Sequence, residues 1–139
     1  MTLYVVDVCV AVKWYIPEIF SQESLKLLEL GRNLIAPDYL LLEAGSVFGK
    51  KIRRKEISFE FGQQALSSLG DSPVQLIDTQ DLLQDAFTLA NEAQRSIYDC
   101  FYLRLAMQEN CQMVTADEKL FNASKDTAWS EYLCWIENL

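Results

Sequence analysis

Short apolar runs alternate along the chain with longer segments in which apolar residues recur every three to four positions. The short runs are rich in β-branched and aromatic residues and predict buried strands. They cover residues 2–7, 33–37, 73–78 and 111–117. The longer segments predict amphipathic helices. We expect helices at residues 8–30, with a break near Pro17 and an end at Gly31, and at 37–55, 58–70, 79–94, 96–110 and 118–124.

Strands that alternate with helices indicate parallel pairing through right-handed crossovers. The expected fold class is therefore α/β, a three-layer α/β/α sandwich with a central, mainly parallel sheet. The final segment, residues 131–139, fits either an edge strand or a helix, and we favour the strand. No internal repeat, linker or low-complexity tract divides the chain, so we expect one domain over residues 1–139.

Composition favours a folded intracellular protein. Half of the 139 residues are apolar, yet no apolar run is long enough to span a membrane. The N-terminus lacks the basic leader of a secretory signal, and we expect a cytoplasmic location. Four widely spaced cysteines lie among apolar neighbours and predict free, buried thiols in a reducing compartment; they are Cys9, Cys100, Cys111 and Cys134.

The chain contains no histidine. This excludes zinc sites built from histidine, and it excludes a histidine general base and with it most triad-type hydrolases. The cysteines form no closely spaced pair that suits a metal. Any acid–base or metal chemistry must therefore use carboxylates.

Four carboxylates interrupt apolar surroundings. Asp7 directly follows the first predicted strand, and Asp117 follows the strand at residues 111–117. Because the carboxyl ends of parallel strands meet at one edge of a sheet, these two side chains are expected near each other. Glu43 and Asp99 lie within apolar helical segments that offer no polar stripe to hold them in solvent.

Each acid has a structural explanation when taken alone. Asp7 and Asp117 suit helix caps, Asp99 suits a capping box with Ser96, and Glu43 suits a pair with a buried arginine. Four carboxylates at one sheet edge would repel one another, however, and a bound cation or shared protons would relieve that repulsion. Oxygen ligands without histidine favour Mg²⁺ or Mn²⁺, which suits hydrolysis of a phosphodiester.

Four stretches, "VVDVCVAVKW", "APDYLLLEAGSVFGKKIRR", "IYDCFYLRLA" and "VTADEKLF", occur in an order and spacing that resemble the PIN-domain ribonucleases, specifically the VapC-type toxins of toxin–antitoxin pairs. The resemblance spans residues 3–121. It implies a metal-dependent endoribonuclease that acts on RNA, forms a homodimer and is inhibited by a cognate antitoxin whose tail covers the site.

The resemblance also implies roles for particular residues. Asp7, Glu43, Asp99 and Asp117 would form the catalytic Mg²⁺ site, with Thr115 as a supporting hydroxyl beside the last acid. One departure concerns the position three residues after the helical glutamate. Family members often have asparagine there, and this chain has Ser46, which weakens the expected support around the acids.

The formal charge of −8 argues against a generic nucleic-acid binder, but the charge is uneven. Residues 50–55 form a basic block that, by itself, is typical of a solvated helix end. The resemblance makes it a candidate surface for RNA backbone or for an antitoxin. The side chains expected to contact RNA are Lys13, Lys50, Lys51, Arg53 and Arg54.

Other classes fit less well. A haloacid-dehalogenase-type phosphatase needs a second aspartate two residues after the first, where this chain has Cys9. A receiver domain needs a phosphorylatable aspartate after its third strand and a lysine after its fifth, and neither pattern is present. The remaining alternative is a PIN-like module that binds RNA or a protein partner without cleaving it.

Overall fold

The computed structural model describes all residues from 1 to 139. Its centre is one five-stranded sheet in the order β3-β2-β1-β4-β5, and every neighbouring pair is parallel. The strands are β1 (Thr2–Val6), β2 (Arg32–Pro37), β3 (Gln75–Ile77), β4 (Gln112–Thr115) and β5 (Leu133–Trp135). The predicted α/β class and parallel sheet are confirmed.

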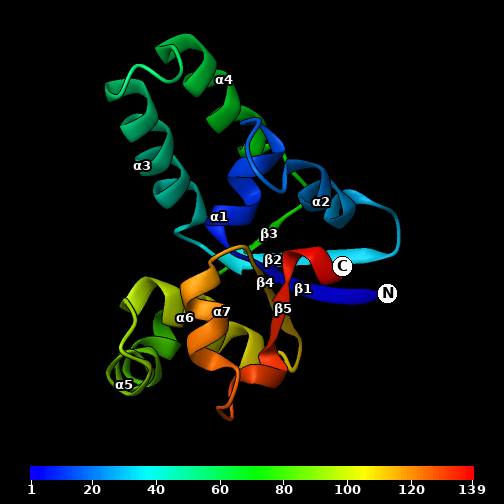
Figure 1. Ribbon diagram of the computed structural model, residues 1–139, viewed down its shortest axis with the longest axis vertical. Helices are drawn as coiled ribbons and strands as arrows, with labels where there is room; N and C mark the ends of the chain where they lie inside the picture. The colour runs from blue at the N-terminus through cyan, green and yellow to red at the C-terminus, as the bar shows by residue number, and fades with distance from the viewer.

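Helices cover both faces of the sheet (Figure 1). One layer contains α1 (Val8–Ala11), α2 (Ser21–Leu25), α3 (Leu40–Arg53) and α4 (Phe59–Gly70). The other contains α5 (Leu83–Ala93), α6 (Ile97–Gln108) and α7 (Glu118–Ser124). The three-layer sandwich is therefore as expected, and α3 and α4 form a hairpin that projects away from the sheet.

Helix α6 is the central helix of its layer and packs against β1, β2 and β4. Its side chains Tyr102, Leu103 and Leu105 are fully or almost fully buried. Because α5 packs against another side of α6, this helix is apolar around most of its circumference rather than along one stripe. The charged side chains on α6 are Asp99, in its first turn, and Arg104, which pairs with Asp85.

The break expected near Pro17 is confirmed, because the helical segment after β1 ends at Trp14 and α2 begins at Ser21, but other predicted helix boundaries are wrong. The helix expected at residues 8–30 is replaced by α1, a 3₁₀ turn at Val12–Trp14, α2 and a second 3₁₀ turn at Lys26–Leu28. Gly31 does not cap it but lies in the turn before β2, with φ of 90°, a backbone conformation that glycine adopts without strain. Pro37 is the last residue of β2 and not the start of α3.

Other elements lie close to their expected ranges. Helix α4 begins after Ser58, whose hydroxyl accepts a hydrogen bond from the amide of Phe61, and α7 has the predicted bounds. The chain end forms the edge strand β5, flanked by the 3₁₀ turns Ser130–Tyr132 and Ile136–Asn138. A 3₁₀ turn at Gln80–Leu82 precedes α5. None of the helices has the length and apolar character to cross a membrane.

All four cysteines are free, as predicted. Cys100 and Cys134 are buried. The expectation of four buried thiols is wrong for Cys9, on α1, and for Cys111, just before β4, which are half-buried.

Candidate active site

The carboxyl ends of β1 and β4 bring Asp7 and Asp117 to one edge of the sheet. The two strands are neighbours, with Val6 opposite Val114, so the residues that follow them leave the sheet side by side. Asp7 is the next residue after β1, and Asp117 lies two residues beyond the end of β4. The predicted positions of these two acids are therefore confirmed.

Glu43 and Asp99 reach the same edge from the two helical layers. Glu43 lies in the first turn of α3, and Asp99 in the first turn of α6. The hydroxyl of Tyr102, on α6, donates a 2.7 Å hydrogen bond to Oε1 of Glu43 and so connects the layers. Burial raises the pKa of Glu43, and the charge of Asp99 raises it further. The two acids are thus close enough to repel each other.

Asp7 is the most buried of the four acids, with 4% of its surface exposed. It occupies the N-cap position of α1 but makes no capping hydrogen bond; instead its Oδ2 accepts from the thiol of Cys9 at 2.9 Å. Burial raises its pKa from an ordinary 3.8 to about 7, and the charges of Asp99 and Glu43 contribute to the rise. The side chain of Asp7 therefore does not cap α1, and the capping explanation for this acid is wrong.

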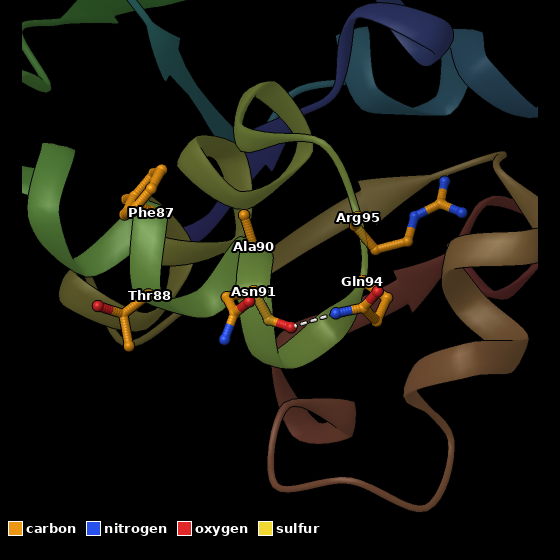
Figure 2. A pocket seen from close by; sticks show the side chains of 6 residues that line it. All are labelled: Phe87, Thr88, Ala90, Asn91, Gln94 and Arg95. Atoms are coloured by element: carbon orange, nitrogen blue, oxygen red, sulfur yellow. Dashed lines mark hydrogen bonds between the residues drawn. The ribbon is translucent and has the colours of Figure 1, made fainter.

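A guanidinium lies between the other two acids. Nη2 of Arg95 is 2.8 Å from Oδ2 of Asp117 and 3.4 Å from Oδ2 of Asp99. Figure 2 shows the Arg95 side chain leaving the α5–α6 connection and extending toward α7, away from the other five residues of a pocket of about 490 Å³ on α5. Burial raises the pKa of Asp99, and Arg95 opposes that rise.

The structural explanations hold for Asp117 and Asp99 and fail for Asp7 and Glu43. Oδ1 of Asp117 accepts from the amide of Leu120 at 3.1 Å and caps α7. Ser96 caps α6 by accepting from the amide of Asp99 at 3.2 Å, which is one half of a capping box. Glu43 has no arginine partner and is held by a tyrosine hydroxyl instead. Caps and a shared site are compatible, because capping uses one oxygen of Asp117 and the backbone of Asp99.

The donor set fits a hard divalent cation in its chemistry. All four candidates are carboxylates, and burial, together with the charge of a neighbouring acid, raises the pKa of Asp7, Glu43 and Asp99 although Arg95 lies beside Asp99. The arrangement itself is not a ready coordination sphere: no three Asp, Glu or Cys side chains lie close enough together to hold a metal ion. A cation bound by Asp99 and Asp117 has to replace Arg95 as their partner.

Three further residues belong to this edge. Thr115 is fully buried, and its Oγ1 accepts from the amide of Asp117 at 3.0 Å, so it positions the turn that carries this acid. Tyr102 and Arg95 were not predicted from the sequence. Arg95 had a signal: it is the one cation between Lys55 and Arg104, and it lies four residues before Asp99. Ser46 is exposed and makes no hydrogen bond to the acids.

The predicted basic residues separate into two groups. Lys13, Lys50, Lys51 and Arg54 line one pocket between α1 and α3. Arg53 does not line it; its guanidinium lies back along α3 near Gly49. Lys13 is 8% exposed and pairs with Glu18, which also pairs with Lys51.

The family model of the PIN domain matches residues 4–126, and the chain therefore belongs to the PIN domain family. The resemblance inferred from the four sequence stretches is confirmed at the level of the family. No curated protein matches the sequence significantly.

Solved structures share the fold at low sequence identity. PAE2754 from Pyrobaculum aerophilum is similar with a TM-score of 0.67 and 18% identity, covering 98% of this chain and 85% of that chain. VapBC2 from Rickettsia felis, bound to a DNA fragment from its promoter, has a TM-score of 0.65 and 16% identity over 96% and 98%. A toxin–antitoxin complex from Klebsiella pneumoniae has a TM-score of 0.61 and 12% identity over 100% of both chains.

Proposed function

We propose that this protein is a Mg²⁺-dependent endoribonuclease whose site is formed by Asp7, Glu43, Asp99 and Asp117, with Mn²⁺ as an alternative ion. One observation carries the proposal: in a PIN-domain chain, four acids from four separate elements gather at one sheet edge, where Asp99 raises the pKa of both Asp7 and Glu43. Bringing four carboxylates together costs electrostatic free energy that helix capping alone does not require. A bound cation would offset that repulsion.

The protein's own residues would orient the acids. Tyr102 fixes one oxygen of Glu43, Cys9 fixes one oxygen of Asp7, and Thr115 positions the turn that carries Asp117. These hydrogen bonds use Oε1 of Glu43 and Oδ2 of Asp7, and we propose the second oxygen of each carboxylate as a ligand. A bound Mg²⁺ would lower the pKa of a water molecule and offset charge on the phosphodiester.

We further propose that the protein is the toxin of a toxin–antitoxin pair, is cytoplasmic and forms a homodimer. Support comes from the fold, which it shares with VapBC2 and with the Klebsiella complex. A mostly apolar pocket of about 610 Å³ beside Glu43 is a candidate contact for an antitoxin; it includes Leu41, Leu42 and Leu66. Copurification with the product of an adjacent reading frame tests the partner, and light scattering tests the dimer.

One observation favours the alternative of a non-catalytic binding module. Arg95 already neutralises Asp99 and Asp117, and no three ligands are preassembled. A protein that only binds RNA or a partner would need nothing more at this edge.

RNA cleavage distinguishes the two functions. We expect the wild type to cleave a mixed single-stranded RNA with Mg²⁺ and to lose cleavage in chelator. Asp99→Asn should lower the rate at least about 100-fold, because it removes a ligand charge while the Ser96 cap remains. The matched control is Asp85→Asn, an exposed acid on α5 that pairs only with Arg104. Absence of metal-dependent cleavage by the wild type would support the binding module, whereas equal cleavage by wild type and Asp99→Asn would contradict the role of Asp99.

A further inference from the structure

A pocket of about 340 Å³ lies between α1 and α3, and its wall is unusually basic for a chain of net charge −8. Four cationic side chains and one carboxylate line it: Lys13, Lys50, Lys51, Arg54 and Glu18. The four positive charges therefore exceed the single negative charge. These cations come from two separate elements, the turn after α1 and the second half of α3, so the basic pocket exists only in the folded protein.

The basic pocket is continuous with the carboxylate edge. On α3, Glu43, Val47 and Arg54 are spaced so that they share one helix face, and Lys50 and Lys51 lie between the last two. Lys50 follows Glu43 by seven residues, about 10 Å along the helix axis. On the other wall, Cys9 lines the pocket while its thiol donates to Asp7. A strand lying along this face would contact both sites.

The carboxylate of Glu18 already contacts two of the pocket's cations. Its Oε1 lies 3.0 Å from Nζ of Lys13, and its Oε2 lies 3.4 Å from Nζ of Lys51. The side chain of Lys13 is more than nine-tenths buried, so its charge needs a nearby anion. Glu18 comes from the irregular segment between the first 3₁₀ turn and α2, and it is 28% exposed. Lys50 and Arg54 have no acidic partner in the protein.

We propose that this basic pocket binds a backbone phosphate of the RNA strand next to the one cleaved, and that Glu18 occupies part of the phosphate position in the free protein. The proposal rests on the proposed ribonuclease function. Lys50 and Arg54 supply the contacts that are free, and Lys13 supplies one shared with Glu18. Lys51 supplies one shared with Glu18 and with Glu56, whose Oε2 lies 3.6 Å from its Nζ. Contacts of this kind hold the strand in register without reading its sequence.

Oligonucleotide binding without metal tests the pocket separately from cleavage. The probe is a fluorescent single-stranded DNA oligonucleotide, which has the same phosphate backbone, titrated in chelator at several salt concentrations. Lys50→Gln and Arg54→Gln should each weaken binding about three- to fivefold at low salt. Because each variant removes one cation that neutralises a phosphate, each should also reduce the slope of log K against log salt by about 0.7.

Two variants make the test specific. Arg53→Gln removes the same charge from the adjacent residue, which does not line the pocket, and should change binding little. Glu18→Gln removes the internal anion and should tighten binding; thermal melting confirms that the variant is folded. Lys50→Gln and Arg54→Gln keep the test decisive if Glu18→Gln is unstable.

The proposal is overturned if Arg53→Gln weakens binding as much as Arg54→Gln, because the effect is then one of diffuse charge. It is also overturned if the wild type does not bind the probe, or if Lys50→Gln and Arg54→Gln bind the probe as tightly as the wild type. Loss of RNA cleavage in all conditions, with the pocket variants behaving as expected, would instead reject the nuclease function alone.

Discussion

Asp7 illustrates how a single carboxylate is kept at an unfavourable position in the core. It is buried, its side-chain hydrogen-bond donor is a thiol, and the charges of two other acids act on it. The folded protein holds its proton to about pH 7, whereas the unfolded chain releases it near the ordinary pKa of 3.8. Raising the pH from 4 to 7 therefore favours the unfolded state.

Asp7→Asn should remove this pH dependence. In chelator we expect the variant to be more stable than the wild type at pH 8, by up to about 4 kcal/mol, with the advantage shrinking to nothing near pH 4. Urea unfolding at several pH values measures the difference. Asp126→Asn, at an exposed position without a salt bridge, serves as the control. An advantage that is the same at pH 4 and pH 8 would contradict the burial of an ionisable Asp7.

Arg95 is predicted to act as an internal substitute for a metal ion. Arg95→Gln should lower the melting temperature in chelator, because Asp99 and Asp117 lose the charge between them. The same variant should bind Mn²⁺ more tightly than the wild type, since no guanidinium has to leave. Calorimetric titration and melting curves measure the two effects. Weaker Mn²⁺ binding by Arg95→Gln would mean that Arg95 supports the metal site rather than competing with it.

The sequence predicted the four acids but not the partners that hold them. An acid within an apolar segment can be recognised from the sequence, because its neighbours along the helix or strand are apolar and offer no polar stripe. Tyr102 looks like an ordinary core residue in the sequence, and its bond to Glu43 joins positions 59 residues apart. From the sequence, Arg53 and Arg54 were likewise treated as one basic surface. Adjacent residues of a helix point in different directions, and only Arg54 lines the basic pocket.

At the scale of elements, two polar contacts join α6 to α3: the hydroxyl of Tyr102 donates to Glu43, and the hydroxyl of Tyr39, at the N-cap of α3, donates to the carbonyl of Tyr98. Tyr102→Phe keeps the ring in the core and removes only the hydroxyl that donates to Glu43. We expect a loss of about 1.5–3 kcal/mol in the free energy of unfolding, because the hydroxyl donates to a carboxylate. Tyr132→Phe is the control, because that hydroxyl makes no hydrogen bond. Equal losses in the two variants would contradict a link between α3 and α6.

The region between β1 and β2 shows why helix length was mispredicted. Its residues are apolar enough for a helix, yet the chain turns back at Pro17, and Phe20 takes a left-handed conformation with φ of 67°. The indole of Trp14 then donates to the carbonyl of Ser24, so the two short helices pack against each other instead of forming one rod. Such a turn depends on tertiary contacts that hydrophobic periodicity does not contain.

At the scale of the whole molecule, the strand order determines which residues meet. Alternating strands and helices predict a parallel sheet, and this was sufficient to place Asp7 and Asp117 at one edge. The order β3-β2-β1-β4-β5 could not be read from the pattern, because the crossover from β3 to β4 passes over two strands. It is this crossover, through α5 and α6, that brings Asp99 and Arg95 to the same edge as Asp7.

Titration of the metal-free protein with Mn²⁺, followed by calorimetry, tests the central claim that the four acids form one cation site. The wild type should bind Mn²⁺ saturably, and Asp99→Asn should show no binding above that of buffer. Asp85→Asn, which changes an exposed acid outside the group, should bind as the wild type does. Equal Mn²⁺ binding by Asp99→Asn and the wild type would contradict the account.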